Sequence, residues 1–176
     1  GHTALVALDQ YVPQLTLITQ NVDGLHQEAG SKGVIELHGN IKRTLCFDCG
    51  RAVDSWAETA VSPPQCPACN GNLRPDVVWF GESLPQEALA VAMLAAGECD
   101  LFISVGTSAL VQPAASLPLL ALQNGVPTVE INPETTRISH LVDVRLPMRA
   151  APALDMIWSR YRERAPQSAA DGPQVY

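Results

Sequence analysis

The sequence contains no apolar run long enough to cross a bilayer, and its N-terminus lacks a basic stretch followed by an apolar one. We therefore expect a cytoplasmic protein with no membrane partner. Basic residues are scarce, since 11 lysines and arginines stand against 18 acidic residues and give a formal net charge of -7. This balance lacks the clustered positive charge that binds a phosphate backbone, so no direct nucleic-acid partner is expected.

The 176 residues are 47% hydrophobic, which is enough to bury one core. Short β-branched apolar runs alternate with segments of helical spacing. Strands are expected at 15–19, 34–37, 101–105, 128–131 and 142–146. Helices are expected at 3–11, at 83–97 with Ser83 as its cap, and at 151–162. A further apolar helix is expected after residue 108; it ends at 124, and Pro118 should kink or shorten it. This alternation predicts an α/β fold, a Rossmann-like parallel sheet with helices on both faces.

Polar residues follow four of the expected strands, where parallel sheets bind their ligands. They are Gln20 and Asn21, His38, Gly106-Thr107-Ser108, and Asn132. The Gly106 to Ser108 segment is expected to open a helix and to offer N–H groups, two hydroxyls and the helix dipole to an anion. A small-residue turn required only by packing is the alternative for this segment.

Four cysteines form two C-x2-C pairs, Cys46 with Cys49 and Cys66 with Cys69, with 16 residues between the pairs. This spacing is typical of a four-thiolate zinc site, and four protein ligands leave no position for a catalytic water. The surrounding stretch is rich in turn residues, so we interpret it as an inserted module built on one structural zinc. Unrelated buried thiols and a redox C-x-x-C are the alternatives. The fifth cysteine, Cys99, is expected to be a core thiol.

A series of motifs in order along the chain resembles that of the sirtuins. The segments are Thr19–His26, His38-Gly39, the paired cysteines, Arg74–Glu82, Gly106–Ser108 and Asn132–Glu134. The resemblance covers about residues 1–164 and implies a Rossmann-type domain, residues 1–41 and 77–164, that carries a zinc-ribbon small domain, residues 42–76. Residues 165–176 are expected to be a disordered tail. The family's first strand and its glycine-rich loop have no counterpart before Thr19, so the sequence is similar to a sirtuin that is truncated at its N-terminus.

The resemblance also implies an activity. Sirtuins are NAD-dependent protein-lysine deacylases, which transfer the acyl group from lysine to the ADP-ribose of NAD and release nicotinamide. The expected partners are thus NAD and acylated lysine in proteins or peptides. Two alternatives stay open on the sequence: an inactive, truncated NAD-binding protein, and a zinc-ribbon interaction protein without catalysis.

Individual roles follow from the matched motifs. His38 corresponds to the general base that acts on a ribose hydroxyl, a role that suits imidazole because it titrates near neutral pH. The matched cofactor contacts are Gln20, Asn21 and Asp23 around the nicotinamide and its ribose, Gly106, Thr107 and Ser108 at phosphate and ribose, and Asn132 and Glu134 at the adenosine ribose. The matched acyl-lysine contacts are Val78, Phe80, Gly81 and Glu82, with Val111 opposite them. A loop capped by its own Asx turns is the alternative for residues 20–24, and ordinary core packing is the alternative for Val78 and Phe80.

Overall fold

The computed structural model describes residues 1–56 and 62–164, so the tail expected at 165–176 lies outside the described residues. The strands are β1 (Ile18–Thr19), β2 (Ile35–Glu36), β3 (Gly39–Cys46), β4 (Leu73–Val77), β5 (Phe102–Val105), β6 (Thr128–Ile131) and β7 (Val144–Leu146). The helices are α1 (His2–Asp9), α2 (Leu25–Glu28), α3 (Gln86–Glu98), the 3-10 turn η1 (Ala114–Ser116), α4 (Leu117–Gln123) and α5 (Ala150–Arg164). Within the described ranges, no helix is both long enough and apolar enough to cross a membrane.

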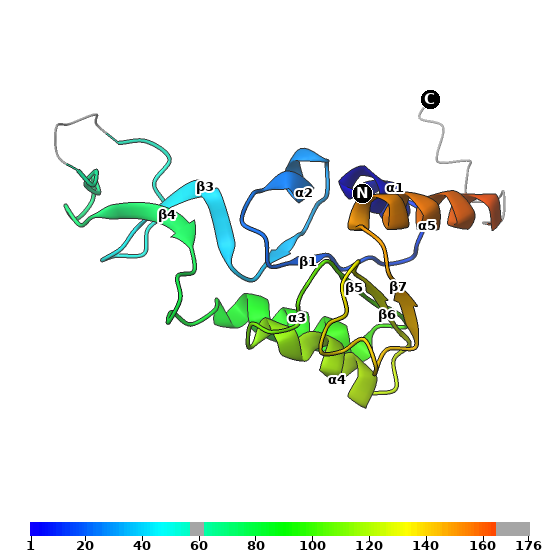
Figure 1. The fold of residues 1–176 in the computed structure, drawn as a ribbon. Coiled ribbons are helices and arrows are strands. Elements are labelled where there is room, and N and C mark those ends of the chain that lie inside the picture. The colour runs from blue at the N-terminus through cyan, green and yellow to red at the C-terminus, as the bar shows by residue number, and fades with distance from the viewer. Residues whose placement is uncertain (57–61, 165–176) are drawn as a thin grey trace, which may run out of the picture.

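The parallel strands lie in two groups. β5, β6 and β7 form one sheet in that order, and β1 pairs with β2. Helices α1 and α5 lie on one side of β5–β7, and α3 and α4 lie on the other (Figure 1). The expected helix-covered parallel arrangement is therefore present, although hydrogen bonds do not join its strands into one sheet over the residues described.

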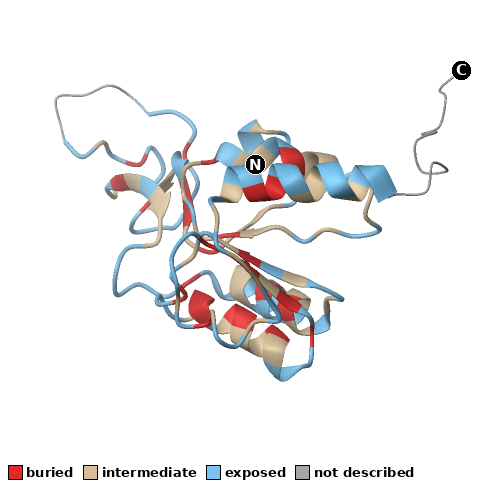
Figure 2. Ribbon diagram, turned by 45° about the vertical axis from the view of Figure 1, so that its right-hand side comes forward, coloured by how far each residue is buried: buried red, intermediate tan, exposed pale blue. Residues whose placement is uncertain are grey.

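Two apolar clusters hold these layers together. Ala4, Ala153 and Leu154 of α1 and α5 bury Ile131 of β6 completely. On the opposite side, Ala92 and Ala96 of α3 pack with the fully buried Leu37, next to the β1–β2 pair. Figure 2 shows that buried residues gather where helices meet strands. Leu37, the residue before His38, is thus anchored in the larger core.

The segment around the cysteines contains two strands that the sequence did not predict. β3 and β4 pair antiparallel, with an irregularity between Asn40 and Thr44. Their first paired position is Gly39, whose φ is +80° and whose missing Cβ would lie 2.1 Å from the carbonyl oxygen of Asp76. Apolar periodicity is weak here because this hairpin buries few side chains. Strand β3 begins directly after His38 and leads into the cysteine module.

Helix boundaries differ from the prediction at three positions. α3 begins at Gln86 with Pro85 at the N-cap position, so Ser83 does not cap it. Gly97 lies inside α3, where its carbonyl accepts a 3.0 Å hydrogen bond from the Asn124 side chain. Pro118 falls in the first turn of α4, where its missing N–H has no intrahelical partner to lose, so it neither kinks nor shortens that helix.

Candidate functional site

The four paired cysteines converge on one point. Their sulfur atoms all lie within 4.8 Å of one another, with Cys46 and Cys66 buried and Cys49 and Cys69 exposed. Figure 1 shows this module at the far end of the molecule from α1 and α5. Four thiolates at this spacing match the closed tetrahedral set of a structural zinc, and the cysteines are therefore placed to bind one zinc ion.

Two matching turns position the sulfurs. In the first, the N–H of Gly50 donates to the carbonyl of Cys46 at 3.0 Å, and in the second, Asn70 donates to Cys66 at 2.9 Å. Gly50 and Asn70 hold equivalent places and both have a positive φ, of 67° and 60°. Each C-x2-C pair thus ends in a left-handed residue that closes the turn, as two copies of one structural unit.

Backbone donors favour the thiolate form at Cys46. The N–H groups of Cys49 and Asp48 lower the pKa of Cys46 to about 7, although burial opposes them. The N–H of Gly71 acts in the same direction on Cys69, but hydrogen bonds among the sulfurs outweigh it and raise the pKa of Cys69 to about 12. A bound zinc ion would displace these competing protons, because only the deprotonated sulfur is a ligand.

His38 lies at the end of β2, half-buried, with its ring fixed by the main chain. Its Nδ1 is 2.9 Å from the carbonyl oxygen of Gln20. A carbonyl only accepts, so Nδ1 carries the proton and Nε2 of the neutral ring keeps its lone pair. The histidine is therefore held in the tautomer that can accept a proton at Nε2.

Thr107 connects this histidine to the loops after β5 and β6. The side-chain amide of Gln20 donates to the Thr107 hydroxyl at 3.4 Å. The buried Asn132 donates to the Thr107 carbonyl at 2.9 Å and accepts from the N–H of Glu134 at 3.0 Å. The structure thus brings together side chains from the ends of β1, β2, β5 and β6, as expected from their places in the sequence.

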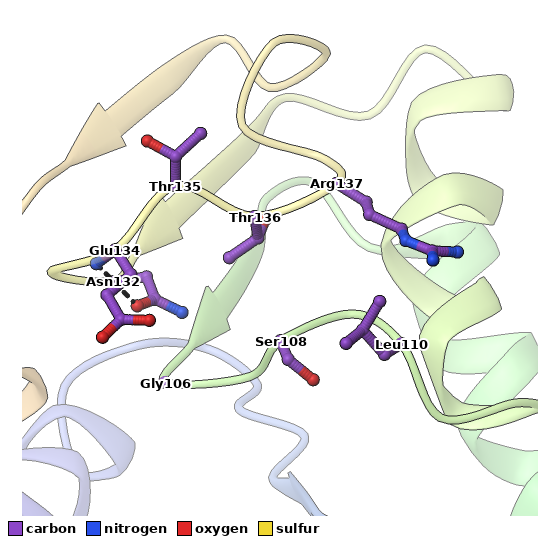
Figure 3. A pocket seen from close by; sticks show the side chains of 8 residues that line it. All are labelled: Gly106, Ser108, Leu110, Asn132, Glu134, Thr135, Thr136 and Arg137. Atoms are coloured by element: carbon purple, nitrogen blue, oxygen red, sulfur yellow. Dashed lines mark hydrogen bonds between the residues drawn. The ribbon is translucent and has the colours of Figure 1, made fainter.

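A hollow of about 480 Å³ opens beside these loops. Ser108 and Leu110 line one side, and Thr135, Thr136 and Arg137 line the other (Figure 3). Gly106, Asn132 and Glu134 complete the lining. This volume and its mixed polar lining suit a nucleoside-sized ligand.

The helix expected to open at Gly106 is not there. An irregular loop follows β5, and helical structure begins only at Ala114. Within that loop the Thr107 hydroxyl accepts the N–H of Ala109, which has a φ of 53°. A helix dipole therefore does not point at this loop, and its hydroxyls and free N–H groups are what remain to contact an anion.

A buried carboxylate supports the far wall of the hollow. Glu130 of β6 is 1% exposed and accepts hydrogen bonds from the hydroxyls of Thr136 and Ser139. Arg145 of β7 lies 3.7 Å from the same carboxylate. Sequence reasoning missed this group because an acidic residue in the middle of an apolar strand gives no sign of what it binds.

The loop after β1 contains one side chain that contacts the main chain and one that faces solvent. Asp23 accepts the N–H of Leu25, the first residue of α2, at 3.0 Å, which is an Asx turn as in the alternative of a self-capped loop. Asn21 is exposed, and its N–H donates to Thr19. Asp23 thus has a structural contact in this state, while the Asn21 side chain is open to solvent.

The loop from Val78 to Glu82 begins beside His38, because the N–H of Val78 donates to the His38 carbonyl at 3.0 Å. Val78 packs on the main core, whereas Phe80 is fully exposed, so the core alternative applies to Val78 only. Gly81 and Val111 are also exposed. Phe80 and Val111 therefore present apolar side chains to solvent.

Glu82 faces the cysteine module. Its carboxylate accepts two hydrogen bonds from Arg74 and one from the N–H of Trp79. These bonds, the Arg74 pair first, lower the pKa of Glu82 to about 2. The Arg74 guanidinium also stacks 4.0 Å from the Trp79 ring. Glu82 thus fixes the shape of the loop, and Arg74, to which the sequence assigned no role, is its partner.

Together, these features define an α/β domain with polar strand ends beside a hollow and with four cysteines placed to bind a metal. The model of the Sir2 family matches residues 1–113. An NAD-dependent protein deacylase of Aquifex aeolicus is 47% identical over 165 residues, covering 93% of this chain and 69% of the relative. NAD-dependent protein deacylase 1 of Pseudomonas aeruginosa is 47% identical over 148 residues, covering 80% of this chain and 59% of the relative. The chain belongs to the Sir2 family.

Solved structures agree with this assignment. A Sir2 homologue in complex with NAD superimposes with a TM-score of 0.86 at 40% identity, covering 94% of this chain and 65% of that one. A Sir2 protein bound to a propionylated peptide gives a TM-score of 0.79 at 33% identity, covering 90% and 69%. The expected Rossmann-like fold is thereby confirmed. The chain spans about two thirds of the length of these proteins.

Proposed function

We propose that this chain is the catalytic portion of an NAD-dependent protein-lysine deacylase of the cytoplasm, with NAD and acylated lysine as its substrates and no nucleic acid or membrane as partner. The observation that carries the proposal is the position of His38. Its Nδ1 is held by the Gln20 carbonyl, and its neighbours on either side are the polar strand ends and the exposed loop at Phe80. Family membership and the names of the relatives support the same reaction.

In this proposal, residues 1–41 and 77–164 form the Rossmann-like domain and residues 42–76 form the zinc-ribbon domain. NAD would lie across the strand ends, with its adenosine ribose at Asn132 and Glu134 and its phosphates and adjoining ribose at Gly106, Thr107 and Ser108. The buried Asn132 already joins the two loops, so this part of the site is organised in advance. Gln20, Asn21 and Asp23 would surround the nicotinamide and its ribose.

The catalytic step assigned to His38 is removal of a proton from a ribose hydroxyl of NAD by Nε2. The lone pair is on Nε2 because the main chain holds the other proton, so no tautomer exchange precedes the step. The acyl group leaves lysine for the ADP-ribose of NAD as nicotinamide is released. Zinc takes no part in the chemistry, since its four protein ligands leave no open position.

The acylated peptide would bind as an extended strand between the loop at Val78, Phe80, Gly81 and Glu82 and the loop at Val111. Main-chain hydrogen bonds supply affinity in this mode and make few demands on sequence. Phe80 and Val111 are exposed, which suits apolar contact with a lysine stem and its acyl group. Glu82 would act indirectly by keeping the loop in shape through Arg74.

The test is release of nicotinamide from NAD in the presence of an acetylated peptide. It is run on this chain and on the chain joined to the segment that the curated relatives have in addition. His38→Ala should lower kcat by about 100-fold to 10,000-fold, the usual contribution of a general base. His140→Ala, at an exposed histidine, is the matched control and should leave the rate unchanged.

Inactivity of both unaltered forms would contradict the proposal and favour the alternatives, an inactive NAD-binding protein or a zinc-ribbon interaction protein. Equal rates for the His38 and His140 variants would contradict the role of the histidine alone.

A further inference from the structure

Glu36, the last residue of β2, has a carboxylate enclosed by donors from two elements. Its side chain is 10% exposed. Oε1 accepts from the Gln27 amide at 2.7 Å and from the Asn40 amide at 2.6 Å, and Oε2 accepts from the Arg43 guanidinium at 2.6 Å. Gln27 belongs to α2, whereas Asn40 and Arg43 belong to β3, so one side chain joins the α/β layers to the cysteine hairpin.

All three partners of Glu36 are donors, which defines the chemistry that the position requires. A carboxylate offers only acceptors on both oxygens, so it meets every partner. A glutamine of the same shape would turn N–H groups toward Arg43 or toward the two amides. Hydrogen bonds to charged groups are also stronger than neutral ones, which makes the loss of charge a separate effect.

The same contacts hold the turn between β2 and β3, which is the corner that carries His38. Glu36 lies in register with Thr19, and the next residue after Thr19, Gln20, supplies the carbonyl that holds His38 Nδ1. On the far side of the histidine, Asn40 returns to Glu36. The His38 main chain thus lies between two positions, Glu36 and Asn40, that one hydrogen bond ties together.

Arg43 extends this connection to the second strand of the hairpin. Its Nε donates to Asp76 of β4 at 2.8 Å while another nitrogen of the guanidinium binds Glu36. Asp76 is also the residue whose carbonyl lies against Gly39. The orientation of β3 and β4 relative to β2 is therefore fixed on both sides of the histidine.

We propose that Glu36 is a positioning residue for His38. Glu36 sets the tautomer of His38 by holding the corner so that Nδ1 of the histidine meets the Gln20 carbonyl. The inference rests on the proposed function in that His38 is the base there. Glu36 itself touches no reacting atom. Without its carboxylate, the corner would relax, the Nδ1 bond would lengthen and the Nε2–H tautomer would become populated, leaving no lone pair at Nε2.

The experiment measures the tautomer directly by 15N NMR of the imidazole nitrogens in the isotope-labelled full chain at about pH 8, where imidazoles are neutral. The His38 signals are assigned by their loss in His38→Gln. The unaltered chain should show the Nδ1–H tautomer at His38. Glu36→Gln should lower the ratio of Nδ1–H to Nε2–H by about fivefold, the factor that corresponds to loss of one net hydrogen bond.

Glu28→Gln is the matched control, since Glu28 pairs only with Lys42 among the described residues and its side chain is 59% exposed. Its His38 tautomer should equal that of the unaltered chain. Arg43→Lys supplies a second variant in case Glu36→Gln does not fold, because Arg43 is half exposed and one ammonium cannot reach both carboxylates as the guanidinium does. It should shift the ratio in the same direction.

Zinc content, measured alongside, reports whether the module is intact. If zinc-bound Glu36→Gln or zinc-bound Arg43→Lys keeps the tautomer of the unaltered chain, the inference is overturned. The readout does not depend on turnover. An inactive chain whose tautomer responds as described would count against the proposed function and leave the positioning role supported.

Discussion

Gly39 shows how one residue fixes the approach of two strands beside the histidine. Its φ of +80° is one that residues with a side chain rarely adopt, and the Asp76 carbonyl lies where a Cβ would be. Gly39→Ala should lower the free energy of unfolding by about 3 kcal/mol or more, because left-handed strain and a backbone clash add.

Gly33→Ala is the matched control for this substitution. Its φ of +61° imposes similar strain, but no atom lies within 4 Å of the added Cβ. Urea unfolding should show a loss of about 1 kcal/mol for Gly33→Ala. Equal losses for the two variants would mean that the close contact at Gly39 relaxes without penalty.

Side chains in short spaced motifs were predictable, whereas long-range partners were not. The cysteine spacing carries its own geometry, and all four sulfurs do converge. The contacts of Arg43 with Asp76 and of Arg74 with Glu82 depend on how β3 and β4 pair. The folded hairpin determines which acidic residue each arginine meets. Local patterns in one sequence do not reveal how β3 and β4 pair.

At the scale of elements, we expect the cysteine module to depend on a bound metal. Among the described residues, its buried cluster consists of Cys46, Val53, Cys66 and Leu73, and two of these are cysteines placed to bind zinc. Such a core is too small to hold the hairpin alone. Cys66→Ala should abolish zinc binding and unfold the module, which metal analysis and circular dichroism would detect.

Cys99→Ala is the control for that substitution, since Cys99 lies at the end of α3, outside the cluster. It should retain the full zinc content. Retention of a folded module by zinc-free Cys66→Ala would show that the hairpin is stable on its own and that the metal has another purpose.

Element types were easier to predict than element limits. Strands β5 and β6 coincide closely with their apolar runs, because both are covered by helices and their apolar side chains pack in the two core clusters. Strands β3 and β4 were missed because polar and charged residues interrupt both of them and their apolar residues follow no regular period. The α3 start was misplaced because capping by Ser83 is a local preference that packing of Leu84 against the core overrides.

At the scale of the whole molecule, His26 makes stability depend on pH. It lies on α2 against His2 of α1, with ring centroids 4.6 Å apart. Burial, and then the His2 charge, lower the pKa of His26 below its usual value of about 6.5. His26 therefore binds a proton more readily in the unfolded chain than in the folded one. The free energy of unfolding should fall as pH drops from about 6.5 through the folded pKa.

His26→Phe keeps an aromatic ring against His2 and removes the titration. The decrease in Tm between about pH 7 and pH 5.5 should become smaller in this variant. His140→Phe, at an exposed histidine, should keep the full decrease. An unchanged decrease in His26→Phe would assign the pH dependence to other groups.

The bond between His38 and Gln20 has a consequence for how this site can vary. Its acceptor belongs to the main chain, whereas the contact with Thr107 uses the side-chain amide of the same residue. Substitutions at position 20 can therefore alter the contact with the loop at Thr107 without removing the hydrogen bond that keeps the proton on Nδ1 of His38. The side chain at position 20 and the tautomer of His38 are thus determined separately. A change in the tautomer requires a movement of the main chain at position 20.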